Sequence, residues 1–344
     1  MYWRIVFQVA ATYVGAVMGA GFASGQEIQE FFARFGYQGL WGILISAALF
    51  SLLGWVMLDL QKRWQINSYA AFFQSLLGVR WGGRADLLVS ALLFVGLLAM
   101  LSGAGALFHE YFGLSRWTGI TLTVVVTALA LWYRGEGVLW INSVLIPLKF
   151  LFCLGIGAVA IFFAASGDGE GIRVLPNPIV RNWAASGILY VSFNLTLAMV
   201  VFASLGKEVH RPGARLGAVG GGIALGVFAF AIGTALLRFP EVMTLEIPMV
   251  AVAAKLGGWP AFFYVMVLWL AMITAAVGDG FSLACRLSQT RRLGYIRACA
   301  LILLAALALA GIRFSQLVRI VYPLCGYLGL AFLPFLFYSW RRRG

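Results

Sequence analysis

The chain has 344 residues, of which 62% are hydrophobic and only 11% are charged. Soluble domains carry about a quarter charged residues, so this composition excludes a soluble globular protein. The 25 basic and 12 acidic residues give a net charge of +13. Because the basic groups fall between long apolar runs, the expected partner is the lipid bilayer and not a nucleic acid.

Stretches without Lys, Arg, Asp or Glu follow one another along the chain. A helix needs about 20 apolar residues to cross the ~30 Å hydrocarbon core, and most of the stretches have that length. They lie at residues 5–26, 35–58, 87–108, 117–133, 182–206, 216–237, 256–278, 298–312 and 320–340, and a further run at 137–167 is interrupted only by Lys149. The pattern predicts an all-α integral membrane protein with ten helices in one transmembrane domain, residues 1–344, and not a β-barrel.

Three segments need separate interpretation. The first apolar stretch is too long for the core of a signal peptide and continues into Gln26 and Glu27, so we interpret it as a retained membrane helix. Residues 67–78 are expected to form a cytoplasmic interfacial helix. Residues 241–255 mix charged and apolar positions after Pro240, which predicts a short amphipathic outer helix that acts as a lid.

Basic residues near the helix ends predict the orientation. With the N-terminus inside, the cytoplasmic segments carry 16 Lys and Arg residues and the outer segments carry 7. The seven outer residues are Arg34, Arg116, Arg173, Arg181, Arg238, Lys255 and Arg313. Both termini are therefore expected on the cytoplasmic side.

The two halves of the chain resemble each other weakly at one offset. A shift of 172 residues aligns Leu98, Ala99 and Met100 with residues 270–272, and Cys153 with Cys325. The predicted repeats are residues 1–166 and 180–340, with five helices each. Because five is odd, the second repeat enters the membrane from the opposite side, and in transporters built from such inverted repeats the site lies between broken helices at the midplane.

Two patches predict these breaks. Residues 19–25 of helix one contain three glycines, each costing a helix about 1 kcal/mol relative to Ala. The same offset leads to residues 191–197, the most polar part of helix six. Close packing of the GxxxG type and interhelical hydrogen bonds are the alternatives. The predicted substrate-binding residues are Gly19, Ala20, Gly21, Phe22, Ser24, Gly25, Ser102, Ser192, Phe193, Asn194 and Thr196.

Charged groups inside the apolar spans are functional candidates, because each costs about 2.5 to 3.5 kcal/mol to insert. Lys149, 12 residues into helix five, is the strongest of them. Its structural alternatives are an ion pair or a hydrogen bond to free carbonyls of a broken helix. Glu27 either caps the outer half of helix one or takes part in coupling. Asp279, late in helix eight, is assigned to coupling, gating or a structural pair. We expect these three residues to carry protons.

Cysteine and histidine patterns give no sign of a metal centre. The four cysteines lie in or near apolar spans without a CxxC pair, and the two histidines are far apart. No disulfide framework, metal or cofactor is predicted. No acidic, His or Ser/His cluster is seen at either membrane face, which disfavours an enzyme.

Residues 13–28 (YVGAVMGAGFASGQEI) and 190–195 (YVSFNL) resemble the YkvI-type bacterial membrane proteins. These are related to the amino-acid/polyamine/organocation superfamily, which has the LeuT fold. The ten-helix layout matches over nearly the whole chain, whereas the motifs cover only helices one and six. The resemblance implies that residues 19–21 offer backbone amides to a substrate carboxylate. It also implies that residues 192–196 offer carbonyls to a substrate amine.

The resemblance also bears on the coupling ion. Sodium-coupled members carry a hydroxyl pair on helix eight, but here Thr274 is followed by Ala275 and Ala276. Proton-coupled members place a lysine of helix five in the vacant sodium site, and Lys149 matches that position. The resemblance therefore favours protons over sodium.

The sequence thus predicts a secondary active transporter in the bacterial cytoplasmic membrane. Its expected substrates are small amine-containing solutes, with amino acids implied by the superfamily. Alternating access driven by a proton gradient through Lys149 is the expected mechanism. The alternatives are a ligand-binding sensor on the same fold, like the membrane subunits of germinant receptors, and a sodium-coupled transporter. No particular oligomeric state is predicted.

Overall fold

The computed structural model describes residues 2–66, 69–133, 138–163, 177–204, 211–291 and 293–342, and this part of the chain is built from helices without a strand. The first half comprises α1 (Tyr2–Val17), α2 (Ala20–Ala23), α3 (Gln26–Phe31), η1 (Ala33–Phe35), α4 (Tyr37–Trp64), α5 (Tyr69–Leu77), α6 (Val79–Phe112), α7 (Arg116–Trp132) and α8 (Val138–Phe163). The second half comprises α9 (Trp183–Ser204), α10 (Ala214–Arg238), η3 (Pro240–Thr244), α11 (Pro248–Lys255), α12 (Gly258–Arg291), α13 (Tyr295–Leu309), α14 (Phe314–Gln316), the π-helical η4 (Leu317–Val321), α15 (Tyr322–Leu330) and α16 (Leu333–Arg342).

Several helices are long and apolar enough to span a membrane. Among the described residues the stretches that meet this criterion are Tyr37–Trp64, Leu87–Phe112, Ala214–Arg238, Gly258–Ser288 and Phe314–Arg342. Four shorter apolar helices accompany them at Arg116–Trp132, Pro147–Val159, Trp183–Met199 and Tyr295–Leu309. The all-helical membrane fold expected from the charge-free runs is confirmed.

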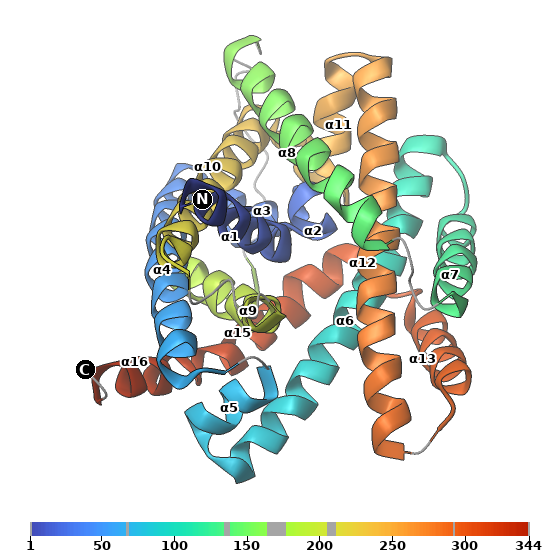
Figure 1. Ribbon diagram of the computed structural model, residues 1–344. Coiled ribbons are helices and arrows are strands. Elements are labelled where there is room, and N and C mark those ends of the chain that lie inside the picture. Colours follow the sequence, from blue (N-terminus) through green and yellow to red (C-terminus); the bar gives the residue numbers. More distant parts are fainter. Residues whose placement is uncertain are drawn as a thin grey trace.

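The helices form two groups (Figure 1). In one group α1, α4, α9 and α10 pack on one another, and in the other α6, α7, α12 and α13 do so. The helix α8 contacts both α10 and α12, so it bridges the groups. Each half of the chain contributes neighbouring helices to each group, which is the arrangement expected of an inverted repeat.

Glycines of α10 let α1 approach closely. A side chain at Gly217 would overlap the carbonyl of Val6, and one at Gly221 would overlap the ring of Tyr13. Small residues at helix contacts are how membrane helices gain packing energy in the absence of a hydrophobic driving force. The N-terminal half of the broken first helix is therefore held against α10.

The two short amphipathic segments form helices as predicted. Helix α5 lies within residues 67–78, of which 67 and 68 fall outside the described residues. Residues 241–255 form η3 and α11, and Pro248 opens α11 because its missing N–H is not needed at a first helical position. The predicted lid is thus helical.

Asp59, near the end of α4, is a buried charge with three partners. Its carboxylate pairs with Arg63 at 2.8 Å and with Arg215 of α10 at 3.0 Å. It also accepts a hydrogen bond from Nε1 of Trp340, at 3.1 Å. One carboxylate thereby ties α4, α10 and α16 together at one end of the bundle.

Replacing Asp59 by Asn is expected to lower the free energy of unfolding by about 2 kcal/mol. Both arginines are more than a third exposed, so solvent screens them and the loss stays below that of a fully buried pair. The thermal midpoint of the purified protein in detergent measures the effect. Glu241→Gln is the control, because Glu241 pairs with Lys255 at the surface and is expected to contribute less than about 0.5 kcal/mol. Equal midpoints for both variants would contradict the assignment.

Candidate functional site

The first helix is broken twice within the glycine-rich stretch. Helix α1 ends at Val17, the short helix α2 begins at Ala20, and α3 begins at Gln26. Gly25, with φ +83°, supplies the left-handed turn between α2 and α3, a conformation that only glycine adopts without strain. The predicted break in helix one is confirmed.

The break leaves backbone groups available. The bond from the Ala23 N–H to the Gly19 carbonyl closes the first turn of α2, so the N–H groups of residues 20–22 precede it and lack partners inside the helix. On the other side, the Met18 carbonyl accepts a hydrogen bond from Nζ of Lys149 at 3.2 Å. The lysine of α8 therefore holds the end of α1.

A second contact from the neighbouring helices holds the other side of the break. The hydroxyl of Tyr264, on α12, donates to the Ala23 carbonyl, and Sγ of Cys153 on α8 lies 3.5 Å from that hydroxyl. Lys149 and Cys153 are one helical turn apart on α8. Thus α8 and α12 hold both ends of the unwound segment.

Helix six is not broken, and the prediction of a second break was wrong. The helix α9 runs without interruption from Trp183 to Ser204. Ser192, Asn194 and Thr196 each donate to the carbonyl four residues earlier, at 2.8, 3.0 and 3.1 Å. Such back-bonding satisfies polar side chains inside the helix, so these groups leave the backbone helical and its carbonyls are not freed for a ligand.

Glu27 is the buried acid of the site. It is 5% exposed, and its Oε2 accepts a hydrogen bond from the Tyr190 hydroxyl at 3.1 Å. The side chain folds back toward α2, where a methyl group at Gly21 would overlap Oε1. Glu27 therefore faces the unwound segment and does not act as a capping residue at the surface.

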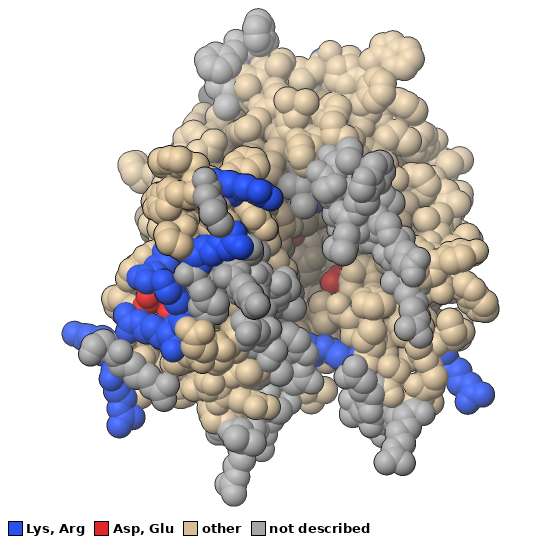
Figure 2. All heavy atoms as spheres, viewed as in Figure 1, with Lys and Arg blue, Asp and Glu red and all other residues tan. Residues whose placement is uncertain are grey.

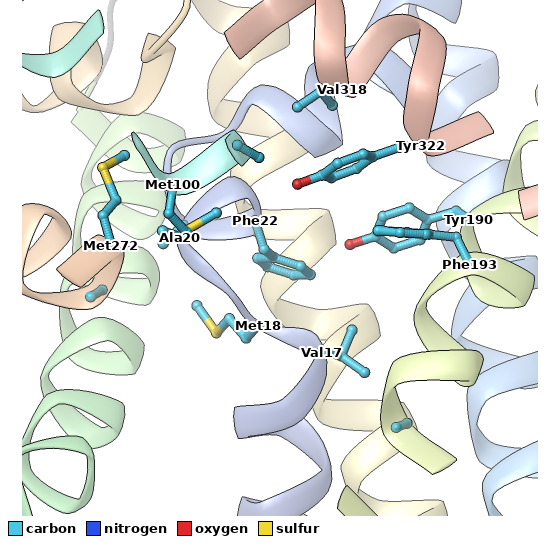
Figure 3. Packing of buried hydrophobic residues seen from close by; sticks show 14 of the residues in the cluster. Val17, Met18, Ala20, Phe22, Met100, Tyr190, Phe193, Met272, Val318 and Tyr322 are labelled. Carbon is cyan, nitrogen blue, oxygen red and sulfur yellow. The ribbon is translucent and has the colours of Figure 1, made fainter. Parts of the chain in front are cut away.

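Aromatic side chains from three helices lie close together beside the break (Figure 3). Phe22 comes from α2, Tyr190 and Phe193 come from α9, and Tyr322 begins α15; the hydroxyls of both tyrosines point toward the space beside Phe22. The rings of Phe193 and Tyr322 are packed with centroids 4.5 Å apart. The site thus combines a carboxylate, phenol groups and aromatic faces.

Of the other residues predicted for the site, one lies at the break and two form hydrogen bonds elsewhere. Ser24 belongs to the turn, because its Oγ accepts from the Gln26 N–H and donates to the Gly21 carbonyl. Ser102 does not reach the break, since its hydroxyl donates to the Ile312 carbonyl. The Thr274 hydroxyl donates to Ala271 of its own helix.

Asp279 lines the interior from α12. A side chain at Gly96 of α6 would overlap its carboxylate. The Asp279 side chain is partly exposed. Figure 2 shows a hollow near the centre of the face on which the N-terminus is seen, with acidic atoms inside it.

A polar cluster joins the segment before α11 to neighbouring helices. The Glu110 carboxylate accepts the N–H groups of Glu246 and Ile247 at 2.7 and 3.0 Å. The Glu246 side chain pairs with Arg116 and accepts the Ser315 N–H at 3.2 Å. The chain between η3 and α11 is thereby bound to α6, α7 and α14, which covers the predicted outer face.

Replacing Glu246 by Ala is expected to loosen this cover. Loss of the pair with Arg116 and of the bond from Ser315 should speed amide exchange in α11 about tenfold, corresponding to about 1.4 kcal/mol of local stability. Hydrogen–deuterium exchange of residues 245–256 measures it. Glu241→Gln, which changes an exposed acid of the same segment, should leave the exchange rates unchanged; unchanged rates in Glu246→Ala would contradict the closing role.

Sequence reasoning gave no role to the tyrosines that complete the site. Tyr190 and Tyr322 supply the hydroxyls near Glu27, and Tyr264 holds α2. Each lies in a charge-free apolar run, where tyrosine is common, so the sequence carries no signal that distinguishes them. No group of three or more His, Cys, Asp or Glu residues suited to a metal ion occurs among the described residues.

Comparisons place the chain among known membrane proteins. No protein-family model matches it. It is 31% identical over 327 residues to the membrane protein YkvI of Bacillus subtilis (strain 168), covering 95% of this chain and 93% of that relative. The structure is similar to the inward-facing conformation of Mhp1, with a TM-score of 0.69, 16% identity, and 96% of this chain and 74% of that one covered.

A second solved structure agrees. MhsT in complex with L-phenylalanine matches with a TM-score of 0.64 and 16% identity, over 96% of this chain and 87% of that one. At these identities the likeness shows the fold, and it is the LeuT fold expected above. The identity to YkvI extends over nearly the whole of both chains. The chain is a multi-pass membrane protein and belongs to the YkvI family.

Proposed function

We propose that the chain is a secondary active transporter of small amine-containing solutes, driven by protons through Lys149 and working by alternating access. The observation that carries this proposal is the hydrogen bond from Nζ of Lys149 to the Met18 carbonyl, at the end of α1. Lys149 is only 7% exposed, and an ammonium group in such a place needs the dipoles of the unwound backbone as its partner.

Proton loss from Lys149 would change the hold on α1. A charged donor makes a stronger hydrogen bond to a carbonyl than a neutral donor does. The hydrogen bond from the neutral Lys149 amine to the Met18 carbonyl is therefore weaker than that from the ammonium group. Because α1 packs on α10 through glycine contacts, a shift of α1 is passed on to the group of helices that contains it. Protonation thereby biases which face of the site is open.

The likeness to solved transporters supports this proposal. Mhp1 is a nucleobase-cation-symport-1 family transporter, and the MhsT structure holds L-phenylalanine. The covered outer face and the hollow on the opposite face fit one state of an alternating-access cycle. The fold and its neighbours offer no support for an enzymatic role.

Uptake by the full chain in proteoliposomes tests the proposal. With a pH gradient, inside alkaline, we expect labelled amines or amino acids to accumulate, and we expect a protonophore to abolish the accumulation. Replacing sodium by potassium should have no effect. Binding without accumulation would indicate a sensor, and sodium-dependent accumulation would indicate the other coupling ion; either result would overturn the proposal in its present form.

A further inference from the structure

Glu27 has no countercharge in the part of the chain that the structure describes. Among the described residues no Lys, Arg or His nitrogen lies within ion-pair distance of its carboxylate, and the Tyr190 hydroxyl is the group that donates to it. No described group donates a hydrogen bond to Oε1, which lies against the bare Cα of Gly21. A buried carboxylate is stable when it keeps a proton or when a cation pairs with it. One oxygen of Glu27 is therefore open to a ligand.

A second polar group near it is also without a partner. Tyr322 is 96% buried, since its exposed fraction is 4%, and its hydroxyl has no hydrogen-bond partner among the described residues. Figure 3 shows this hydroxyl pointing into the same space as that of Tyr190. Its oxygen is not among the fully buried side-chain atoms without a partner, so the hydroxyl can reach a polar group placed in that space.

The walls of this space fit an organic cation. Phe22, Tyr190, Phe193 and Tyr322 present aromatic rings from three helices. Aromatic faces attract ammonium groups, and more strongly where water is excluded. A carboxylate beside such rings is the chemistry that recognises a positively charged nitrogen.

The same geometry excludes a carboxylate on the substrate. The break in α1 offers its free N–H groups at residues 20–22, but the Glu27 carboxylate already lies against Gly21. When Glu27 is ionised, as it is when an ammonium group pairs with it, a substrate carboxylate bound there would meet a like charge at close range, and like charges destabilise each other strongly away from water. An amino-acid zwitterion therefore fits this site poorly.

We infer that Glu27 binds the ammonium group of an organic amine that carries no carboxylate beside its nitrogen. The ammonium donates to Oε1 of Glu27, the free Tyr322 hydroxyl accepts from it, and the aromatic rings cover its alkyl part. This inference rests on the proposed function for its site, but it concerns equilibrium binding alone and requires no transport.

Matched ligands test the inference on the wild-type chain. Phenethylamine, phenylalanine and 2-phenylethanol share one aromatic body and differ in charge, as do 3-methylbutylamine, leucine and 3-methylbutanol. Titration calorimetry on the purified full chain in detergent should show that each amine binds at least about tenfold more tightly than the amino acid or the alcohol of its series. Equal or tighter binding of the amino acids would overturn the inference, and so would a lack of amine binding at millimolar concentration.

Variants test the role of Glu27 itself. Glu27→Gln keeps the size and removes the charge, so amine binding should fall at least about tenfold, and Tyr322→Phe should weaken it about threefold to tenfold. Glu241→Gln, a surface acid paired with Lys255, is the matched control and should bind normally. Amine binding by Glu27→Gln at wild-type strength would overturn the inference. If Glu27→Gln fails to fold, the ligand series on the wild type and the Glu27→Asp variant still decide.

Failure of the transport proposal is separable from failure of this inference. Glu27-dependent amine binding without accumulation in proteoliposomes supports the inference and removes transport. Accumulation of amino acids that persists in Glu27→Gln supports transport and overturns the inference.

Discussion

Lys149→Ala is expected to abolish proton-driven uptake while the protein stays folded. The substitution removes the group that donates to the Met18 carbonyl, and with it the proposed link between protonation and the position of α1. Accumulation under a pH gradient in proteoliposomes should fall by at least about two orders of magnitude, because a residue that acts as the coupling group leaves no parallel route. Initial rates of labelled-solute uptake measure the loss.

Two controls separate coupling from folding in this experiment. Lys149→Arg keeps a positive charge that does not release its proton, so it should retain the melting temperature and fail to accumulate solute. Lys255→Ala removes an exposed lysine of the lid that pairs with Glu241 and should transport normally. Undiminished proton-driven uptake by Lys149→Ala would remove Lys149 from the mechanism.

Gly21→Ala is expected to disrupt the ligand site, whereas Gly19→Ala is not. A methyl group at Gly21 would overlap Oε1 of Glu27, and the nearest atoms are the end of that side chain. Glu27 must move, so amine binding should fall by at least about tenfold, and the displacement should cost about 1 to 3 kcal/mol of stability. Titration calorimetry and the thermal midpoint measure the two effects.

Gly19→Ala is the matched control in the same break. No atom lies within 4 Å of a methyl group built at Gly19, and its backbone is extended with φ −70° and ψ −174°, which alanine adopts readily. Binding should stay within about twofold, and stability should be unchanged or slightly higher because alanine restricts the unfolded chain. Equal losses in both variants would show that the glycines act only through backbone flexibility and not through Glu27.

Much of the fold was predictable because helices that span a membrane require long apolar runs without charged residues. The charge-free runs anticipated the apolar helices, and the glycines of residues 19–25 anticipated the break in helix one. Lys149 was identified because a lone charge in an apolar run is costly wherever the helix lies, and it does lie against the broken helix. These features are local, and one segment of sequence suffices to show them.

The sequence was a poor guide at positions where the local residues are compatible with more than one structure. Residues 192–196 are polar, and polar side chains are compatible both with an unwound backbone and with hydrogen bonds inside a continuous helix. The structure has the second outcome. Glu27 was expected to cap a helix or take part in coupling, and its contact with Tyr190, 163 residues away, placed it inside the site.

The sequence by itself determined the membrane class, the helical fold, the broken first helix and the lone charge of Lys149 inside an apolar helix, because the costs of burying charge and of keeping glycine in a helix belong to single segments. Only the tertiary structure decided that α9 stays intact, that Ser102 bonds to Ile312, and that Glu27, Tyr190 and Tyr322 meet. These outcomes depend on which groups from distant segments reach one another after packing, and packing is a property of the whole bundle.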